Sequence, residues 1–368
     1  MSAKKVLFRQ HGMLRTKALA AVACLSCLSV GMPAMAAIQQ TVTDASSTAV
    51  AVPAPSQIHA IGDAWPAHLE VLSMLGAGAK VVSYVNVDTP EKRPWLAVVN
   101  PQMKQASPAF TKTDVNVEEM LKDKPDVVFS IVTPRMRTKL QELNIPNVQL
   151  TFTNFKELEK TFDLTAKILG PDAQKRADDF NAYLEEKLQQ VRSYTSTLPE
   201  SKKPRVLHVV HFNPLTIDGG HSLIDAWIKA AGGVNVAEDV HGSLKVTSKE
   251  QMLAWNPDVI IFGGSAMPDP ATRASELKAL ESDPMWASVN AVKHHQVYIN
   301  PNGAFLWDRY GAETALQVQW AAKTLHPEHF KNLDMAKETK SFYHRFLNYD
   351  LTDKQVNEIL QDLPPKTL

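Results

Sequence analysis

Two stretches that echo each other carry most of the information about the fold. Residues 115–129 read VNVEEMLKDKPDVVF, and residues 247–261 read TSKEQMLAWNPDVII. Aligned on their Pro-Asp pairs, the two stretches are offset by 132 residues, and three similar pairs coincide: Glu118 and Glu250, Met120 and Met252, Leu121 and Leu253. Each reads as a short helix feeding a strand. The echo predicts a duplicated α/β unit, although any turn from helix to strand in such a protein can favour Pro-Asp.

Short apolar runs alternate with helical patterns on both sides of these stretches. Strands are expected at 57–61, 80–84, 126–131, 148–152, 205–210, 259–263 and 296–299. Such alternation is typical of parallel sheets with helices on both faces. Between the two sets, residues 172–195 carry one apolar stripe at helical spacing, a helix too long for a normal crossover. We therefore predict an α/β fold of two Rossmann-like lobes with mostly parallel sheets, joined by one long rigid helix.

The N-terminus has the order of a cleaved export signal. Residues 1–36 hold five basic residues and no acidic one, then a 13-residue apolar run, then Ala34-Met35-Ala36. This arrangement predicts a signal peptide and a soluble periplasmic product without membrane insertion, since the run is too short to span a bilayer. Cys24 and Cys27, the two cysteines of the chain, lie inside this segment. A lipoprotein is the alternative, but the residues around them match a lipobox poorly.

The patterns divide the chain into six parts. They are a signal peptide (1–36), a flexible leader (37–56), an N-terminal lobe (57–170), a linker helix (171–198), a C-terminal lobe (199–330) and a helical C-terminal extension (331–368).

Composition excludes several functions. With 44% apolar and 21% charged residues the chain can form a real core. Its 39 basic and 39 acidic residues become 34 and 39 once residues 1–36 are removed, so nucleic-acid binding has no electrostatic support. The sequence contains no Gly-rich phosphate loop, no G-x-S-x-G and no H-E-x-x-H. No catalytic residue is therefore assigned.

Taken together, the motifs resemble the substrate-binding proteins of type II ABC importers, a family with a helical backbone between its lobes. The resemblance covers about residues 56–330 and rests on Asn116-x-Glu118 to Asp126, Gly219-Gly220 to Gly233, and Glu250 to Asp258. It implies a monomer, not an enzyme, that captures a small metal complex between two lobes without a permanently bound cofactor. The ligand would pass to an ABC permease dimer in the inner membrane. An iron-siderophore or other iron complex is the first choice; haem, cobalamin, a nickel complex and a molybdate-type oxyanion stay open.

The resemblance also implies a docking role for Glu118 and Glu250, one on each lobe. In the family, such glutamates pair with arginines of the permease, a contact that is bidentate and sets geometry. The alternative is that both are solvated glutamates favoured at helix starts by the macrodipole.

Loops after the expected strands supply the candidate ligand-binding residues, because ligands of open α/β sheets bind beyond the carboxyl ends of strands. Trp65, Phe212 and Trp307 offer flat apolar walls, or else belong to the core. Arg135 and Arg309 offer cations for an anionic ligand, although Arg309 has acidic neighbours in sequence. His211 and His221 offer imidazoles that complete a metal's coordination, but no metal ligand is assigned directly. The full candidate set is Trp65, Arg135, His211, Phe212, His221, Trp307 and Arg309.

Two other classes of function remain as alternatives. A secreted metal-dependent enzyme would need converging ligands such as His211, His221 and Asp63, yet these form no compact motif. A surface adhesin or sensor would use the same two lobes.

Overall fold

The computed structural model describes residues 39–86, 89–111, 113–263 and 270–365. The chain divides into residues 1–36 and a compact unit of residues 37–368. The expected signal peptide and its two cysteines lie outside the described residues. Within the described residues, no helix has the length and apolarity needed to cross a membrane.

The segment expected to be a flexible leader is an ordered β-hairpin. Strand β1 (Gln39–Thr43) pairs antiparallel with β2 (Ala49–Pro53), and the valines that alternate along them are buried in the core. At the turn, buried Asp44 accepts a hydrogen bond from the Gln149 backbone and forms an ion pair with Arg137. The leader prediction was therefore wrong: the Thr-, Ser- and Pro-rich composition hid a period-two valine pattern.

The N-terminal lobe is built on a five-stranded sheet with the order β5-β4-β3-β6-β7, parallel throughout. Its strands are β3 (Ile61–Asp63), β4 (Val81–Val85), β5 (Ser107–Phe110), β6 (Val127–Ile131) and β7 (Asn147–Leu150). Its helices are α1 (His68–Met74), α2 (Pro94–Val99), α3 (Val117–Asp123), α4 (Pro134–Glu142) and α5 (Phe155–Leu169), with 3-10 turns at Pro55–Gln57, Gly78–Lys80 and Pro101–Gln105. The strand expected at 57–61 begins only at Ile61.

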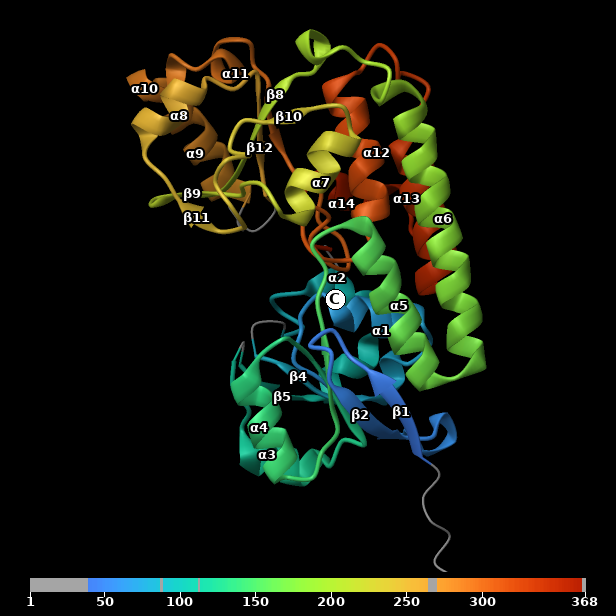
Figure 1. Ribbon diagram of the computed structural model, residues 1–368. Coiled ribbons are helices and arrows are strands. Elements are labelled where there is room, and N and C mark those ends of the chain that lie inside the picture. The colour runs from blue at the N-terminus through green and yellow to red at the C-terminus, as the bar shows by residue number, and fades with distance from the viewer. Residues whose placement is uncertain (1–38, 87–88, 112, 264–269, 366–368) are drawn as a thin grey trace, which may run out of the picture. The chain divides into compact units, whose positions relative to one another are not determined.

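Helix α6 (Pro171–Thr195) confirms the long linker helix. Its predicted stripe is buried, and Phe180 stacks on Phe162 of α5 at 4.0 Å between ring centroids. Figure 1 shows α6 in green, running beside α5 and beside the late helices α12 and α13. The stripe is therefore covered by elements from both halves of the chain.

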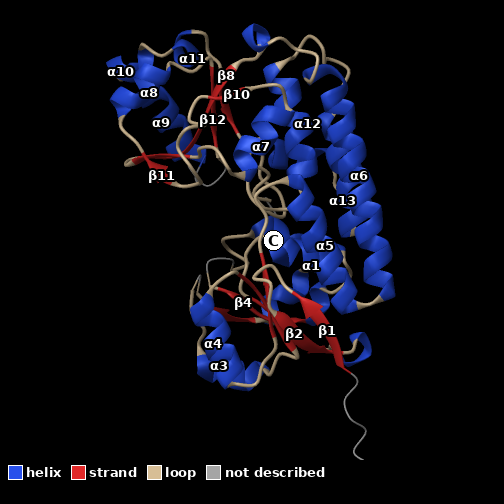
Figure 2. Ribbon diagram, viewed as in Figure 1, coloured by secondary structure: helices blue, strands red, loops and turns tan. Residues whose placement is uncertain are grey.

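The C-terminal lobe holds a six-stranded sheet with the order β11-β9-β8-β12-β13, in which β10 also pairs with β8. Strands β8, β10, β12 and β13 are parallel, whereas β9 is antiparallel to β8 and β11. The two separate sheets are coloured red in Figure 2. The elements are a 3-10 turn (Glu200–Lys202), β8 (Arg205–Phe212), β9 (Leu215–Ile217), α7 (Leu223–Ala230), β10 (Val234–Asn235), β11 (Lys245–Val246), α8 (Lys249–Trp255), β12 (Val259–Phe262), α9 (Pro270–Ser282), α10 (Pro284–Ala287), α11 (Asn290–Lys293) and β13 (Val297–Ile299).

The predicted repeat appears as equivalent structure in the two lobes. Helices α3 and α8 have the same length, and both end at a residue with left-handed φ, Lys124 and Asn256. After each helix, an aspartate at the same offset accepts a backbone N–H at the start of the central strand. Asp126 binds the amides of residues 59 and 60, and Asp258 binds the amide of Arg205. The Pro-Asp pair therefore fixes how each helix enters its sheet.

The chain continues with the helices α12 (Thr314–Leu325), α13 (Met335–Leu347) and α14 (Asp353–Leu360), of which α13 and α14 lie within the expected helical C-terminal extension. They contact both halves of the chain. Lys187 of α6 pairs with Glu338 of α13 at 3.0 Å, and the Trp95 indole of α2 donates to the Leu363 carbonyl at 3.0 Å. The tail is therefore part of the core.

Candidate functional site

An aromatic row runs from the strand ends of the N-terminal lobe to the C-terminal half. Trp65, which follows β3, lies 5.2 Å from Phe152, which follows β7. Phe152 meets Tyr310 edge-on at 5.6 Å, and the Tyr310 hydroxyl lies 2.8 Å from the Ser243 hydroxyl. Trp65 is 8% exposed, and Tyr310 is half-buried. The row marks where the strand-end loops of the two lobes meet.

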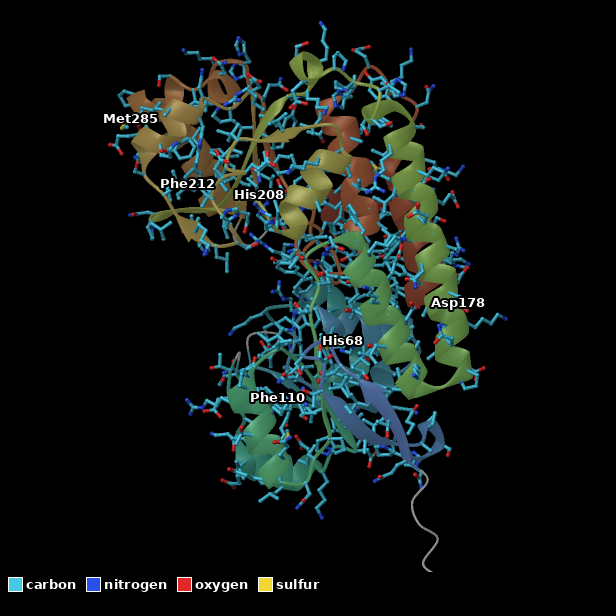
Figure 3. The ribbon with its side chains drawn as sticks, viewed as in Figure 1. His68, Phe110, Asp178, His208, Phe212 and Met285 are labelled. Carbon is cyan, nitrogen blue, oxygen red and sulfur yellow. The ribbon has the colours of Figure 1, made fainter. Side chains whose placement is uncertain are left out.

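Carboxylates at the strand ends are buried and already paired. In the N-terminal lobe, Asp63 binds His68 Nδ1 at 2.9 Å, and burial raises the pKa of Asp63 although His68 opposes this. In the C-terminal lobe, His208 Nδ1 lies 2.9 Å from Asp218 and its Nε2 lies 3.0 Å from Asp308. Burial alone would lower the pKa of His208, but the two carboxylates outweigh it and raise that pKa. Figure 3 labels both buried histidines.

Arg309 lies in this cluster and is not free to meet a ligand. Its guanidinium pairs with Asp218 through two contacts of 3.0 and 2.8 Å, and Arg309 is 8% exposed. Burial opposes the charge of Arg309, but Asp218 and Asp308 raise its pKa. Arg309 and His208 lower the pKa of Asp218 against its own burial. The prediction that Arg309 faces an anionic ligand is therefore corrected, because the charge is neutralised inside the lobe.

Two of the predicted aromatic walls also belong to the interior. Trp307 is fully buried, and its indole N–H donates to Glu313 at 3.0 Å. Phe212, labelled on β8 in Figure 3, is half-buried and packs on Phe262 and Trp286 at centroid distances of 4.5 and 5.5 Å. Trp307 and Phe212 therefore pack in the core, which was the alternative to a role as ligand-binding walls.

Trp65 is buried, and the three other predicted ligand residues are exposed at or near strand ends. Arg135 begins α4 after β6 and pairs with Asp114 at 2.7 Å. His211 is exposed near the end of β8. His221, also exposed, has a left-handed φ of 55° and lies 4.6 Å from the ring of His241. No sequence pattern pointed to His241, Phe152 or Tyr310, because each is brought to its partner by tertiary contacts between separate loops.

Glu118 and Glu250 occupy matching places in the two lobes. Each is the second residue of its helix, after a capping side chain: Asn116 accepts from the Glu118 amide at 3.1 Å, and Ser248 accepts from the Gln251 amide at 3.1 Å. Both glutamates are exposed. Hydrogen bonds at the helix start, to its own backbone and to Ser248, lower the pKa of Glu250, which favours its charged form. Glu118 lies 3.4 Å from Lys122, a weak exposed pair.

A hollow of about 470 Å³ lies elsewhere, between α5, α6 and α7. Phe155, Leu188, Arg192 and Lys229 are among its lining residues. Arg192 lies over the Phe155 ring, and Lys229 pairs with Asp225 and Glu238. Because Arg192 and Lys229 already have partners, and because most of the lining residues lie on these three helices, we do not assign the ligand to it.

Two mostly parallel α/β lobes joined by one continuous helix define a class of solute-binding proteins. A family model described as periplasmic binding protein matches residues 65–304, and the chain belongs to this family. Proteins of this class act outside the cytoplasm, where they bind a small solute and deliver it to an ABC permease. They are not enzymes.

Individual relatives agree with this assignment. The chain is 25% identical over 300 residues to the uncharacterized ABC transporter substrate-binding lipoprotein YvrC of Bacillus subtilis, covering 79% of this chain and 87% of YvrC. It is 26% identical over 266 residues to the molybdate-binding protein MolA of Haemophilus influenzae, covering 67% and 74% of the two chains.

Solved structures show the same fold. A periplasmic solute binding protein of Veillonella parvula matches with a TM-score of 0.73 and 28% identity, over 88% of this chain and 97% of that one. MolA bound to molybdate matches with a TM-score of 0.75 and 21% identity, over 85% and 99%.

Proposed function

We propose that this chain is a periplasmic receptor that binds a small, anionic, metal-containing solute at the strand ends of its two lobes and delivers it to an ABC importer. The proposal that the solute is anionic rests on the carboxylates near the strand ends, which already have partners. Asp63, Asp218 and Asp308 are buried and paired with histidine or arginine. At or near the strand ends, the exposed groups that can donate are His211, Asn213, His221, His241 and Arg135, the last of which already pairs with Asp114. The exposed carboxylate of Asp239 lies two residues before His241.

This pattern favours an anion because the buried carboxylates already have partners, and a negative ligand can accept from the exposed donors. An anionic iron chelate such as a ferric catecholate belongs to this class, as does the molybdate bound by MolA. Trp65 and Tyr310 add partly covered aromatic surface, which suits a chelate with a flat organic shell. An iron complex remains the first choice, with an oxyanion as the second candidate.

Titration calorimetry with a panel of ligands tests the ligand class. The panel contains a ferric catecholate chelate, molybdate, haemin, nickel with histidine, and cyanocobalamin. We expect one anionic member to bind, and at a hundredfold excess over its dissociation constant it should add about 2.7 kcal/mol to the free energy of unfolding. Binding of cyanocobalamin alone would contradict the anionic class. Mass spectrometry of the protein purified from its own periplasm then identifies the natural solute.

We also propose that Glu118 and Glu250 dock the receptor onto the permease. Their exposure, and their equivalent places at the first turns of α3 and α8, support this role. Reversing both to arginine should abolish uptake in cells while leaving solute affinity within about twofold, because neither residue follows a strand end. The matched control reverses Glu185 and Glu328, which are exposed elsewhere. Normal uptake by the Glu118→Arg, Glu250→Arg variant would refute the docking role.

A further inference from the structure

Two exposed histidines on neighbouring loops lie side by side near the junction of the lobes. His221 follows β9, and His241 precedes β11; their ring centroids are 4.6 Å apart and their planes differ by 50°. Neither ring has a hydrogen-bond or ion-pair partner within the described part of the chain. The ring nitrogens are thus available to an outside group.

The backbone around this pair forces the two loops together. Gly219 donates to the carbonyl of Gly242 at 3.0 Å, and Gly242 donates to the carbonyl of Gly220 at 2.8 Å. A Cβ on Gly219 would lie 1.6 Å from the Val240 carbonyl oxygen, and one on Gly220 would lie 2.1 Å from that of Glu238. Only glycine permits this close approach, so the loops hold the histidines at a fixed separation.

The spacing of the ring centres allows both imidazoles to bind one metal ion. A metal lies about 2.0–2.1 Å from an imidazole nitrogen, which puts it about 3.2 Å from the ring centre. Two imidazoles that meet a metal at about 90–110° then have centres about 4.5–5.2 Å apart. The observed 4.6 Å falls in this range.

We propose that His221 and His241 form a two-imidazole site for a borderline divalent transition ion such as Ni²⁺ or Cu²⁺. Neutral imidazole is a preferred ligand for both ions. No cluster of three or more histidine, cysteine or acidic side chains is placed to hold a metal among the described residues. Two protein ligands therefore leave the other coordination positions open. We assign the open coordination positions of the metal to donor atoms of the solute. This step alone rests on the proposed function.

The site lies next to the aromatic row. Ser243, two residues after His241, bonds Tyr310, whose ring meets Phe152 of the N-terminal lobe. The neighbouring amide of Leu244 donates to Asp218 at 3.0 Å, which anchors the loop to the buried charge cluster. A metal held by the two histidines would thus lie close to the place where the strand-end loops of the lobes meet.

Titration of the full protein with NiSO₄ alone tests the site. The variant is His221→Asn, His241→Asn, because asparagine tolerates the left-handed backbone of residue 221 and is a poor ligand for these ions. The control is His294→Asn, His295→Asn, which also removes two exposed histidines, one of them with a φ of 55°. We expect one Ni²⁺ per chain in the wild type and in the control, and at least tenfold weaker binding in the variant. With Cu²⁺, electron paramagnetic resonance should show coupling to imidazole nitrogens that the variant loses.

Equal affinity in wild type and variant, or no metal binding by the wild type, would overturn the proposal. The solute panel is run on the same preparations. A solute that binds while the Ni²⁺ titration is silent refutes this site alone, whereas Ni²⁺ binding without any anionic solute refutes the proposed ligand class alone.

Discussion

At the scale of single residues, two buried carboxyl groups connect the two halves of the chain. Glu70 of α1 accepts from the Ala312 amide at 3.0 Å. Glu313, the next residue, accepts from the Phe305 amide at 2.7 Å and from the Tyr343 hydroxyl at 2.7 Å. Burial raises the pKa of Glu313 to about 7, and burial together with the charge of Glu313 raises the pKa of Glu70 well above its usual value. The folded protein is therefore more stable when these two carboxyl groups are protonated.

This pair should make the protein more stable in mild acid. Between pH 4.5 and about 7 the unfolded chain releases protons that the folded pair keeps, so the free energy of unfolding falls as the pH rises through this window. We expect a loss on the order of 1–3 kcal/mol between pH 5 and pH 7.5, measured by urea unfolding. Glu70→Gln, which keeps an oxygen for the Ala312 amide, should remove the share that Glu70 contributes, whereas the share of Glu313 should remain because burial raises its pKa. An unchanged pH profile in this variant would contradict the role of the pair.

The candidate site shows what sequence alone can predict of single residues. The sequence pattern predicts where strands end, and Trp65, His211 and His221 do lie near strand ends. The sequence pattern does not predict which residues a side chain contacts. Arg309 pairs with Asp218, 91 residues away, and the Trp307 indole donates to a buried glutamate. His241 lies in a loop without periodicity, and only the pairing of two distant loops brings it to His221.

At the scale of elements, helices α3 and α8 were the most predictable parts, because their caps, Pro-Asp turns and strands follow one another within 15 residues. Helix α6 was predictable for the same reason, as its stripe repeats over several turns. The β1–β2 hairpin and the strand β5 were missed, since each is short and its register is fixed by tertiary contacts.

The capping residues of α3 and α8 should matter for stability. Asn116→Ala and Ser248→Ala each remove the side chain that accepts an amide at the helix start, and each should cost about 1 kcal/mol of unfolding free energy. The exposed Ser201, in a 3-10 turn, serves as control as Ser201→Ala. Thermal and urea unfolding measure the effect, and a loss no larger than in the control would show that the caps contribute little.

At the scale of the whole molecule, α6 joins the lobes as one unbroken helix. Bending it would break backbone hydrogen bonds, so we expect only small lobe movements when solute binds. Gln189→Pro, at an exposed position of α6, should lower the free energy of unfolding by about 3 kcal/mol and broaden the distribution of interlobe distances, read by small-angle scattering. Gln189→Ala is the matched control. A proline variant as rigid as this control would show that the contacts of α12 and α13 suffice to hold the lobes.

The hydrogen bond from Trp95 to the Leu363 carbonyl spans 268 positions of the chain. The N-terminal lobe thus contacts residues that are synthesised long after it, as does α1 through Glu70. During synthesis, the emerging polypeptide lacks these late supports and cannot complete its native packing. We therefore expect the N-terminal lobe of a nascent chain to stay incompletely packed until α12 and the residues after α14 have been synthesised.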